Sequence, residues 1–155
     1  MTGPLVEVSV TSPLWDTVDG EAIVRRAVAT AASRETSDQE VSVVLTDDST
    51  IKALNAQWRH RDEPTNVLSF PSPGSGMLGD IVIAYETTAR EAEEEHKPLA
   101  DHLSHLAVHG FLHLLGYDHE SDADADVMEQ LEREILARLG VPDPYMVRER
   151  GQTPE

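Results

Sequence analysis

The sequence LADHLSHLAVHGFLHLLGYDH, residues 99–119, decides how this chain folds, and it carries five of the seven histidines. Leucine and valine occupy most of the helical circumference from Leu99 to Leu115, which predicts a central, buried helix. Gly116 is suited to end that helix in a left-handed conformation. His109 and His113 are four residues apart, so on a helix they project from one face about one turn apart.

A third imidazole completes a predicted metal site. The residues after Gly116 give the chain room to turn back and present His119 beside His109 and His113. Three neutral nitrogen ligands leave a fourth position for water, as in catalytic zinc sites, where the pKa of that water falls to about 7. The chain has no cysteine to offer thiolate ligands. We therefore expect one Zn²⁺ per chain and hydrolytic chemistry, while three imidazoles also suit nickel or copper.

The other four histidines are given different roles. His105 lies on the same helical face as the two helical ligands, but successive turns carry it too far away for all three to bind one ion. We therefore expect His105 to be a neighbour of the site. His60, His96 and His102 are expected to be mostly exposed to solvent.

The histidine spacing also matches the metzincin peptidase motif H-E-x-x-H-x-x-G-x-x-H. In those enzymes the glutamate after the first histidine is the general base, whereas this chain has Gly110 at that position. Asp118 and Glu120 flank His119 and are both candidates to orient or deprotonate water. A zinc metallopeptidase-like hydrolase using one of these acids is one alternative. A non-enzymatic protein with a structural metal is another.

The remaining sequence fits one soluble domain. The length of 155 residues and the 39% hydrophobic content suit a single core. No stretch has the features of a membrane span or a signal peptide, so we expect a cytoplasmic protein. The domain is expected over residues 1–147, with a disordered tail over 148–155. Period-two and helical patterns predict strands near 5–10, 41–46, 66–70 and 78–86, and helices near 19–32, 48–58, 87–95, 99–115 and 121–139.

The net charge of −17 argues against broad binding to nucleic acid, because phosphate contacts depend on lysine and arginine. We expect no DNA partner. The basic residues are unevenly placed, however, since Lys52 lies near the run Arg59, His60 and Arg61. That local strip is suited to hold one phosphate backbone, while the acidic run 91–95 is expected to face water.

Three segments resemble one known family. HGFLHLLGYDH, residues 109–119, resembles the YbeY signature H-G-x-L-H-L-x-G-Y-D-H at every fixed position. The upstream segments LNAQWRHRDEPTNVLSF, residues 54–70, and LGDIVIAYE, residues 78–86, also resemble that family's segments, in the same order. The resemblance runs from about Val41 to Tyr145.

This resemblance implies an α+β fold, which we expect to be a small mixed four-stranded sheet packed with about five helices, with the metal site on a central helix. It implies His109, His113 and His119 as metal ligands, and Arg59 and His109 as catalytic residues. It further implies a zinc-dependent, single-strand-specific endoribonuclease that matures the 3′ end of 16S ribosomal RNA and acts in ribosome quality control. The implied partners are ribosomal RNA and the small ribosomal subunit or its proteins. With this resemblance, the non-enzymatic alternative becomes a ribosome assembly factor with a structural metal.

Two features stay open within that expectation. The nucleophile is either water or a ribose 2′-hydroxyl. Asn66 stands where the family pattern usually has aspartate, so it keeps the hydrogen-bonding shape but not the charge.

Overall fold

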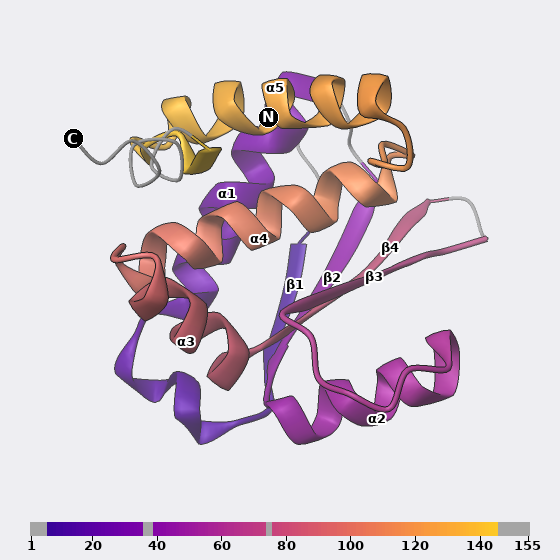
Figure 1. Ribbon diagram of the computed structural model, residues 1–155, viewed down its shortest axis with the longest axis vertical. Helices are drawn as coiled ribbons and strands as arrows, with labels where there is room; N and C mark the ends of the chain where they lie inside the picture. The colour runs from indigo at the N-terminus through magenta and orange to yellow at the C-terminus, as the bar shows by residue number, and fades with distance from the viewer. Residues whose placement is uncertain (1–5, 36–38, 74–75, 146–155) are drawn as a thin grey trace.

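The computed structural model describes residues 6–35, 39–73 and 76–145, which form one α+β domain (Figure 1). The expected disordered tail, 148–155, lies outside the described residues. The elements, in chain order, are β1 (Val6–Val10), a short 3-10 helix (Pro13–Thr17), α1 (Gly20–Glu35), β2 (Glu40–Thr46), α2 (Asp48–Arg59), β3 (Val67–Pro71), β4 (Met77–Ala84), α3 (Tyr85–Glu94), α4 (Leu99–Leu114) and α5 (Asp122–Arg138).

The four strands form one mixed sheet, as predicted. Their order is β1-β2-β4-β3, with β1, β2 and β4 parallel and β3 antiparallel to β4. The run from Ile81 to Ala84 is buried without interruption, because β4 is an inner strand with helices on both faces. β3 is left as an edge strand.

Helices cover the two faces of the sheet unequally (Figure 1). α1 and α4 pack on one face, and α5 packs against both of them. α2 lies on the other face, where Ile51 packs with Leu68 and Val82. α4 is buried on several sides, with Leu103 and Phe111 fully enclosed. This confirms the central, buried helix predicted from the sequence.

Side-chain caps begin two of the helices, and a glycine follows the end of α4 as predicted. The Asp47 side chain accepts a hydrogen bond from the Thr50 amide at the start of α2, at 2.9 Å. The Ser121 hydroxyl does the same for the Asp124 amide at the start of α5, at 3.1 Å. Gly116 follows α4 with φ +107°, in the left-handed region that glycine tolerates.

The loop expected from residue 33 begins later than predicted. α1 continues to Glu35 because its last turn gains tertiary partners: Arg34 pairs with Glu134 of α5 at 3.0 Å, and Glu35 accepts a hydrogen bond from Tyr117. Local sequence carries no sign of these contacts. Within the described ranges, every helix is too short or too polar to cross a bilayer.

Candidate metal centre

Three histidines from two segments meet at one end of α4. His109 and His113 lie on its last turns, one turn apart, and His119 comes from the loop that follows. Each ring offers a nitrogen, and these three nitrogens lie within 4.8 Å of one another. The ring centroids of His109 and His113 are 4.7 Å apart, and His119 lies 5.6 and 5.3 Å from them. The structure thus brings together the three residues that the sequence singled out.

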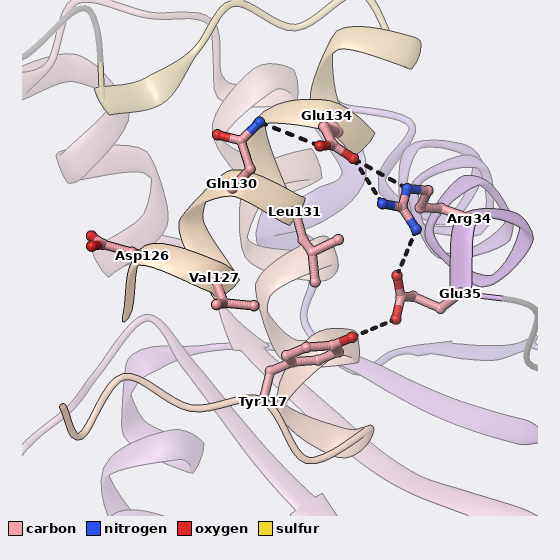
Figure 2. A pocket seen from close by; sticks show the side chains of 8 residues that line it. All are labelled: Arg34, Glu35, Tyr117, Asp126, Val127, Gln130, Leu131 and Glu134. Carbon is pink, nitrogen blue, oxygen red and sulfur yellow. Dashed lines mark hydrogen bonds and ion pairs between the residues drawn. The ribbon is translucent and has the colours of Figure 1, made fainter. Parts of the chain in front are cut away.

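A tyrosine from the same motif anchors the loop that carries His119. The Tyr117 hydroxyl donates a 2.8 Å hydrogen bond to Glu35 at the end of α1 (Figure 2). That hydrogen bond to the carboxylate, together with burial and the negative charge of Glu35, raises the pKa of Tyr117, so the phenol stays a donor. The contact ties the loop to α1 and limits where His119 can lie.

The hollow drawn in Figure 2 is separate from the histidine cluster. Its charged groups satisfy one another: Arg34 bridges Glu35 and Glu134, and Gln130 donates to Glu134. Val127 of α5 also lines this hollow and is 54% exposed. The contacts around this hollow therefore join α1 to α5 and to the loop that carries His119.

Gly110 occupies the position where a metzincin has its catalytic glutamate. It faces the sheet rather than the cleft: a Cβ here would lie 2.9 Å from Ile81 Cγ2 and 3.2 Å from Ser69 Oγ. Ser69 also donates a hydrogen bond to the Gly110 carbonyl. A glutamate has no room at this position, so the peptidase base is excluded by packing as well as by sequence.

We expect Gly110→Ala to lower the free energy of unfolding by about 1–3 kcal/mol, because the added methyl group overpacks the contact with Ile81. Helix propensity alone favours alanine over glycine by about 1 kcal/mol, so the two effects oppose each other. Urea denaturation of the metal-free protein measures the net change. A gain in stability would show that α4 can move away from the sheet at little cost.

A buried carboxylate that sequence reasoning did not identify lies behind the cluster. Glu132 of α5 is 1% exposed. Its Oε2 lies 2.6 Å from His109 Nδ1, and its Oε1 lies 2.8 Å from His105 Nε2. The Tyr145 hydroxyl donates to the same Oε1 at 2.5 Å. A signal was available, because Glu132 falls four residues after Met128 on the apolar face of α5, where a surface acid does not belong.

Glu132 fixes how His109 can act as a ligand. Since Nδ1 of His109 faces the carboxylate, its Nε2 is left for the cleft, as in the carboxylate–histidine pairs that orient metal ligands. Burial alone raises the pKa of Glu132. Hydrogen bonds from His105 and His109, and the positive charge of these rings when protonated, outweigh burial, so its net pKa lies well below the usual value. The carboxylate is therefore charged at neutral pH.

The donor set fits a metal such as zinc. Burial, followed by the charges of His109 and His119, lowers the pKa of His113, which favours the neutral imidazole that a metal requires. His105 does not join the cluster, because its Nε2 is held by Glu132. It is a neighbour of the site, in agreement with the position expected from helix geometry.

His102 was expected to be exposed, and that prediction is wrong. Its ring is 4% exposed because α4 is covered on several sides. His102 Nε2 lies 2.8 Å from Glu91 Oε1, and the Asn66 amide donates to the same oxygen at 2.9 Å. Glu91 belongs to the acidic run that was expected to face water, and it turns partly inward instead. His60 and His96 are exposed, as expected.

These contacts give Asn66 a specific role. Burial raises the pKa of Glu91, but the hydrogen bonds from His102 and Asn66 lower it more, so this carboxyl is also held as a carboxylate. An aspartate at position 66 would place a second negative charge beside it. The Asn66 amide instead donates a hydrogen bond to Glu91. This contact links the residue before β3 to α3 at the edge of the cleft.

Arg59 lies in the same cleft as the histidines. It is the last residue of α2, which His60 ends with φ +60°. Among the residues described, Arg59 forms no ion pair or side-chain hydrogen bond, so its guanidinium is available for a ligand. The cleft has a volume of about 530 Å³. Its lining comprises Arg59, Asn66, Val67, Leu68, Ser69, Pro71, His109, His113, Asp118, His119 and Glu120.

The two candidate acids also line this cleft but differ in their surroundings. Asp118 is partly buried and accepts a hydrogen bond from the Glu120 amide at 3.2 Å, which shapes the turn around His119. Glu120 is exposed. Both carboxylates are within the cleft, so both stay candidates for proton transfer.

The fold and the site together define a class: a small α+β protein with three histidines and a free arginine around one open cleft. Comparison with known proteins gives the family. The sequence matches the family described as Endoribonuclease YbeY over residues 11–140. The chain belongs to the YbeY endoribonuclease family.

Named relatives agree with this assignment over nearly the whole chain. An Endoribonuclease YbeY of Bradyrhizobium sp. (strain BTAi1) is 56% identical, with 95% of both chains covered. One from Nitrobacter hamburgensis is also 56% identical, over 95% of this chain and 85% of the relative. The solution structure of TM1509 from Thermotoga maritima is similar with a TM-score of 0.58, at 25% identity, over 87% of this chain and 91% of that one.

Proposed function

We propose that this protein is a zinc-dependent, single-strand-specific endoribonuclease that processes ribosomal RNA. The observation that carries the proposal is the shared cleft, where Arg59 lies with His109, His113 and His119. The relatives' name, Endoribonuclease YbeY, supports RNA as the substrate. The functional domain is proposed to span residues 1–147.

His109, His113 and His119 would hold one divalent ion through three imidazole nitrogens. The donor chemistry favours zinc, since the cluster has no thiolate and its imidazoles are kept neutral or oriented by their surroundings. A bound zinc ion would supply Lewis-acid stabilisation of the phosphoryl and attacking oxygens. His109 contributes to catalysis in this way, with its ring direction set by Glu132.

The protein's own residues divide the remaining work. Arg59 would donate hydrogen bonds to the phosphoryl oxygens, where negative charge builds as the attacking oxygen approaches phosphorus. Asp118 or Glu120 would accept the proton that the nucleophile loses, whether this is water or a ribose 2′-hydroxyl. The bond from phosphorus to the leaving ribose oxygen then breaks, and that oxygen takes up a proton.

The charge of the chain bears on where the reaction occurs. With a net charge of −17, most of the surface repels a polyanion, so free RNA would be bound weakly. We propose that the substrate is the 3′ region of 16S ribosomal RNA, presented in the cytoplasm on the small ribosomal subunit, whose proteins would add affinity. Ribosome quality control would use the same cleft and chemistry.

The two alternatives are less well supported. A peptidase of the metzincin type lacks its glutamate, and Gly110 leaves no space for one. A purely structural metal would leave the position of Arg59 unexplained. Among the described residues this arginine has no ion-pair partner, and it lines the same open cleft as the three histidines.

Exchange of Arg59 tests the proposal. We expect Arg59→Ala to reduce kcat for single-stranded RNA about 10²–10³-fold with unchanged zinc content, because a donor to the charged transition state is removed. Arg59→Lys should recover part of the rate, since it restores charge without the planar fork.

Arg61→Ala is the matched control, because Arg61 is exposed, lies two residues away and pairs only loosely with Glu63 at 3.8 Å. It should cut RNA at nearly the wild-type rate. Equal rates for the Arg59 and Arg61 alanine variants would remove Arg59 from the mechanism.

A further inference from the structure

Trp58 is unusually placed for a large apolar side chain. Its indole is 61% exposed, the highest value among the large hydrophobic residues described. It continues the face of α2 formed by Ile51 and Leu54, which pack on the sheet. Trp58 instead contacts Phe70 on β3, an edge strand beyond which the described residues form no further strand.

The indole is held in place although it is exposed. Its ring meets the Phe70 ring edge-on, with centroids 6.5 Å apart and an interplanar angle of 64°. This separation and angle lie in the range that aromatic pairs prefer, so the contact favours one orientation of the indole. Trp58 therefore offers an exposed aromatic surface of preferred orientation to a ligand.

This aromatic surface adjoins the cleft at two points. Trp58 precedes Arg59, which lines the cleft. On β3, Ser69 and Pro71 also line the cleft, while Phe70 lies between them and packs on the opposite side with α2. A nucleic-acid strand that ran from the cleft past Arg59 to Trp58 would therefore cross the edge of β3.

The local charges favour a polyanion only weakly. Lys52 is engaged with Asp62 at 3.5 Å, and Arg61 with Glu63 at 3.8 Å. Arg59 is the basic residue here without such a partner in the described part of the chain. Phosphate contacts thus supply little affinity, whereas stacking of a base on an aromatic ring does not depend on net charge.

We propose that Trp58, held by Phe70, is a stacking platform for one unpaired nucleobase of the RNA strand whose phosphate lies at Arg59. This inference rests on the proposed function and adds a binding subsite to it. Only an unpaired base exposes its face for stacking, so the platform selects single strands over duplexes without reading their sequence.

Tryptophan fluorescence can report on Trp58, because the chain has two tryptophans and the other, Trp15, is only 2% exposed. Zinc-loaded protein is mixed in a stopped-flow instrument with a short single-stranded RNA, and binding is read before cleavage. We expect saturable quenching by this RNA and none by the matched duplex or by an abasic oligomer of the same charge. Trp58→Phe, which retains only Trp15, should show no quenching.

Kinetics provide the second readout. Trp58→Ala should raise KM for single-stranded RNA about tenfold and leave kcat nearly unchanged, and Trp58→Tyr should restore KM. Unchanged KM in Trp58→Ala, or equal quenching by the abasic oligomer, would overturn the platform while wild-type cleavage still supported the endoribonuclease. Absence of both RNA binding and cleavage in the wild type would overturn both proposals.

Discussion

His113→Ala is expected to lose both the bound metal and detectable RNA cleavage. The His113 ring lies close to both other ligands, with its centroid 4.7 Å from that of His109 and 5.3 Å from that of His119. Its removal leaves two imidazoles, one of them on a loop, which is too few for the three-ligand site that catalytic zinc requires. Metal content after dialysis and competition with a chelator measure the loss, and cleavage is assayed on the same samples.

The control for His113 is an exposed histidine outside the cleft. His96→Asn suits this purpose, because His96 has φ +57° and asparagine tolerates that conformation. This variant should keep one ion per chain and normal cleavage. If His113→Ala also retained one tightly bound ion, the ligand set proposed here would be wrong.

Glu132→Ala should produce the largest loss of stability of the variants considered. The change removes a buried carboxylate that interacts with three part-buried groups: His105 Nε2, His109 Nδ1 and the Tyr145 hydroxyl. Removing one member of such a buried network costs about 3–5 kcal/mol. The loss of orientation at His109 should also weaken metal binding about 10–100-fold. Denaturation of the metal-free protein and metal competition measure the two effects separately.

Glu132→Gln distinguishes charge from shape. It fills the same space and accepts one hydrogen bond, so its stability should lie between wild type and Glu132→Ala. Because the folded-state pKa of Glu132 is lowered from 4.5, its charge stabilises the fold above pH ~4.5 and loses this effect as pH falls further. The wild-type advantage over Glu132→Gln should therefore be present at neutral pH and shrink as the pH falls below about 4.5. An advantage that persisted unchanged in strong acid would contradict a role for the carboxylate charge.

The residues of the site that could be predicted are those that lie close together in the sequence. Helical spacing placed His109 and His113 on one face, and Gly116 marked the turn that returns His119. The strands and helices were also found from local patterns, with three exceptions. α1 ends later than expected, at Glu35, and α3 begins at Tyr85, where the preceding strand was expected to run to residue 86. The short 3-10 helix Pro13–Thr17 was not expected. Arg59 was identified only through the family resemblance, because it approaches the histidines from a separate helix on the other side of β3.

The contacts that were missed join elements distant in sequence. Glu132 contacts His109 from α5, although the two residues are 23 positions apart in the sequence. His102 appeared polar enough to face water, yet α3 covers it and Glu91 binds it. Local periodicity does not show which helix covers another, so such buried polar pairs emerge only from the tertiary structure.

Cleavage of a 16S ribosomal RNA precursor fragment tests the central claim most directly. Zinc-loaded wild type, Arg59→Ala and His113→Ala are prepared identically, and their folding is verified by circular dichroism before the assay. The account predicts that the wild type cuts the fragment while both folded variants fail. Equal cutting by all three proteins would contradict it, because the activity would then come from neither the histidine cluster nor Arg59.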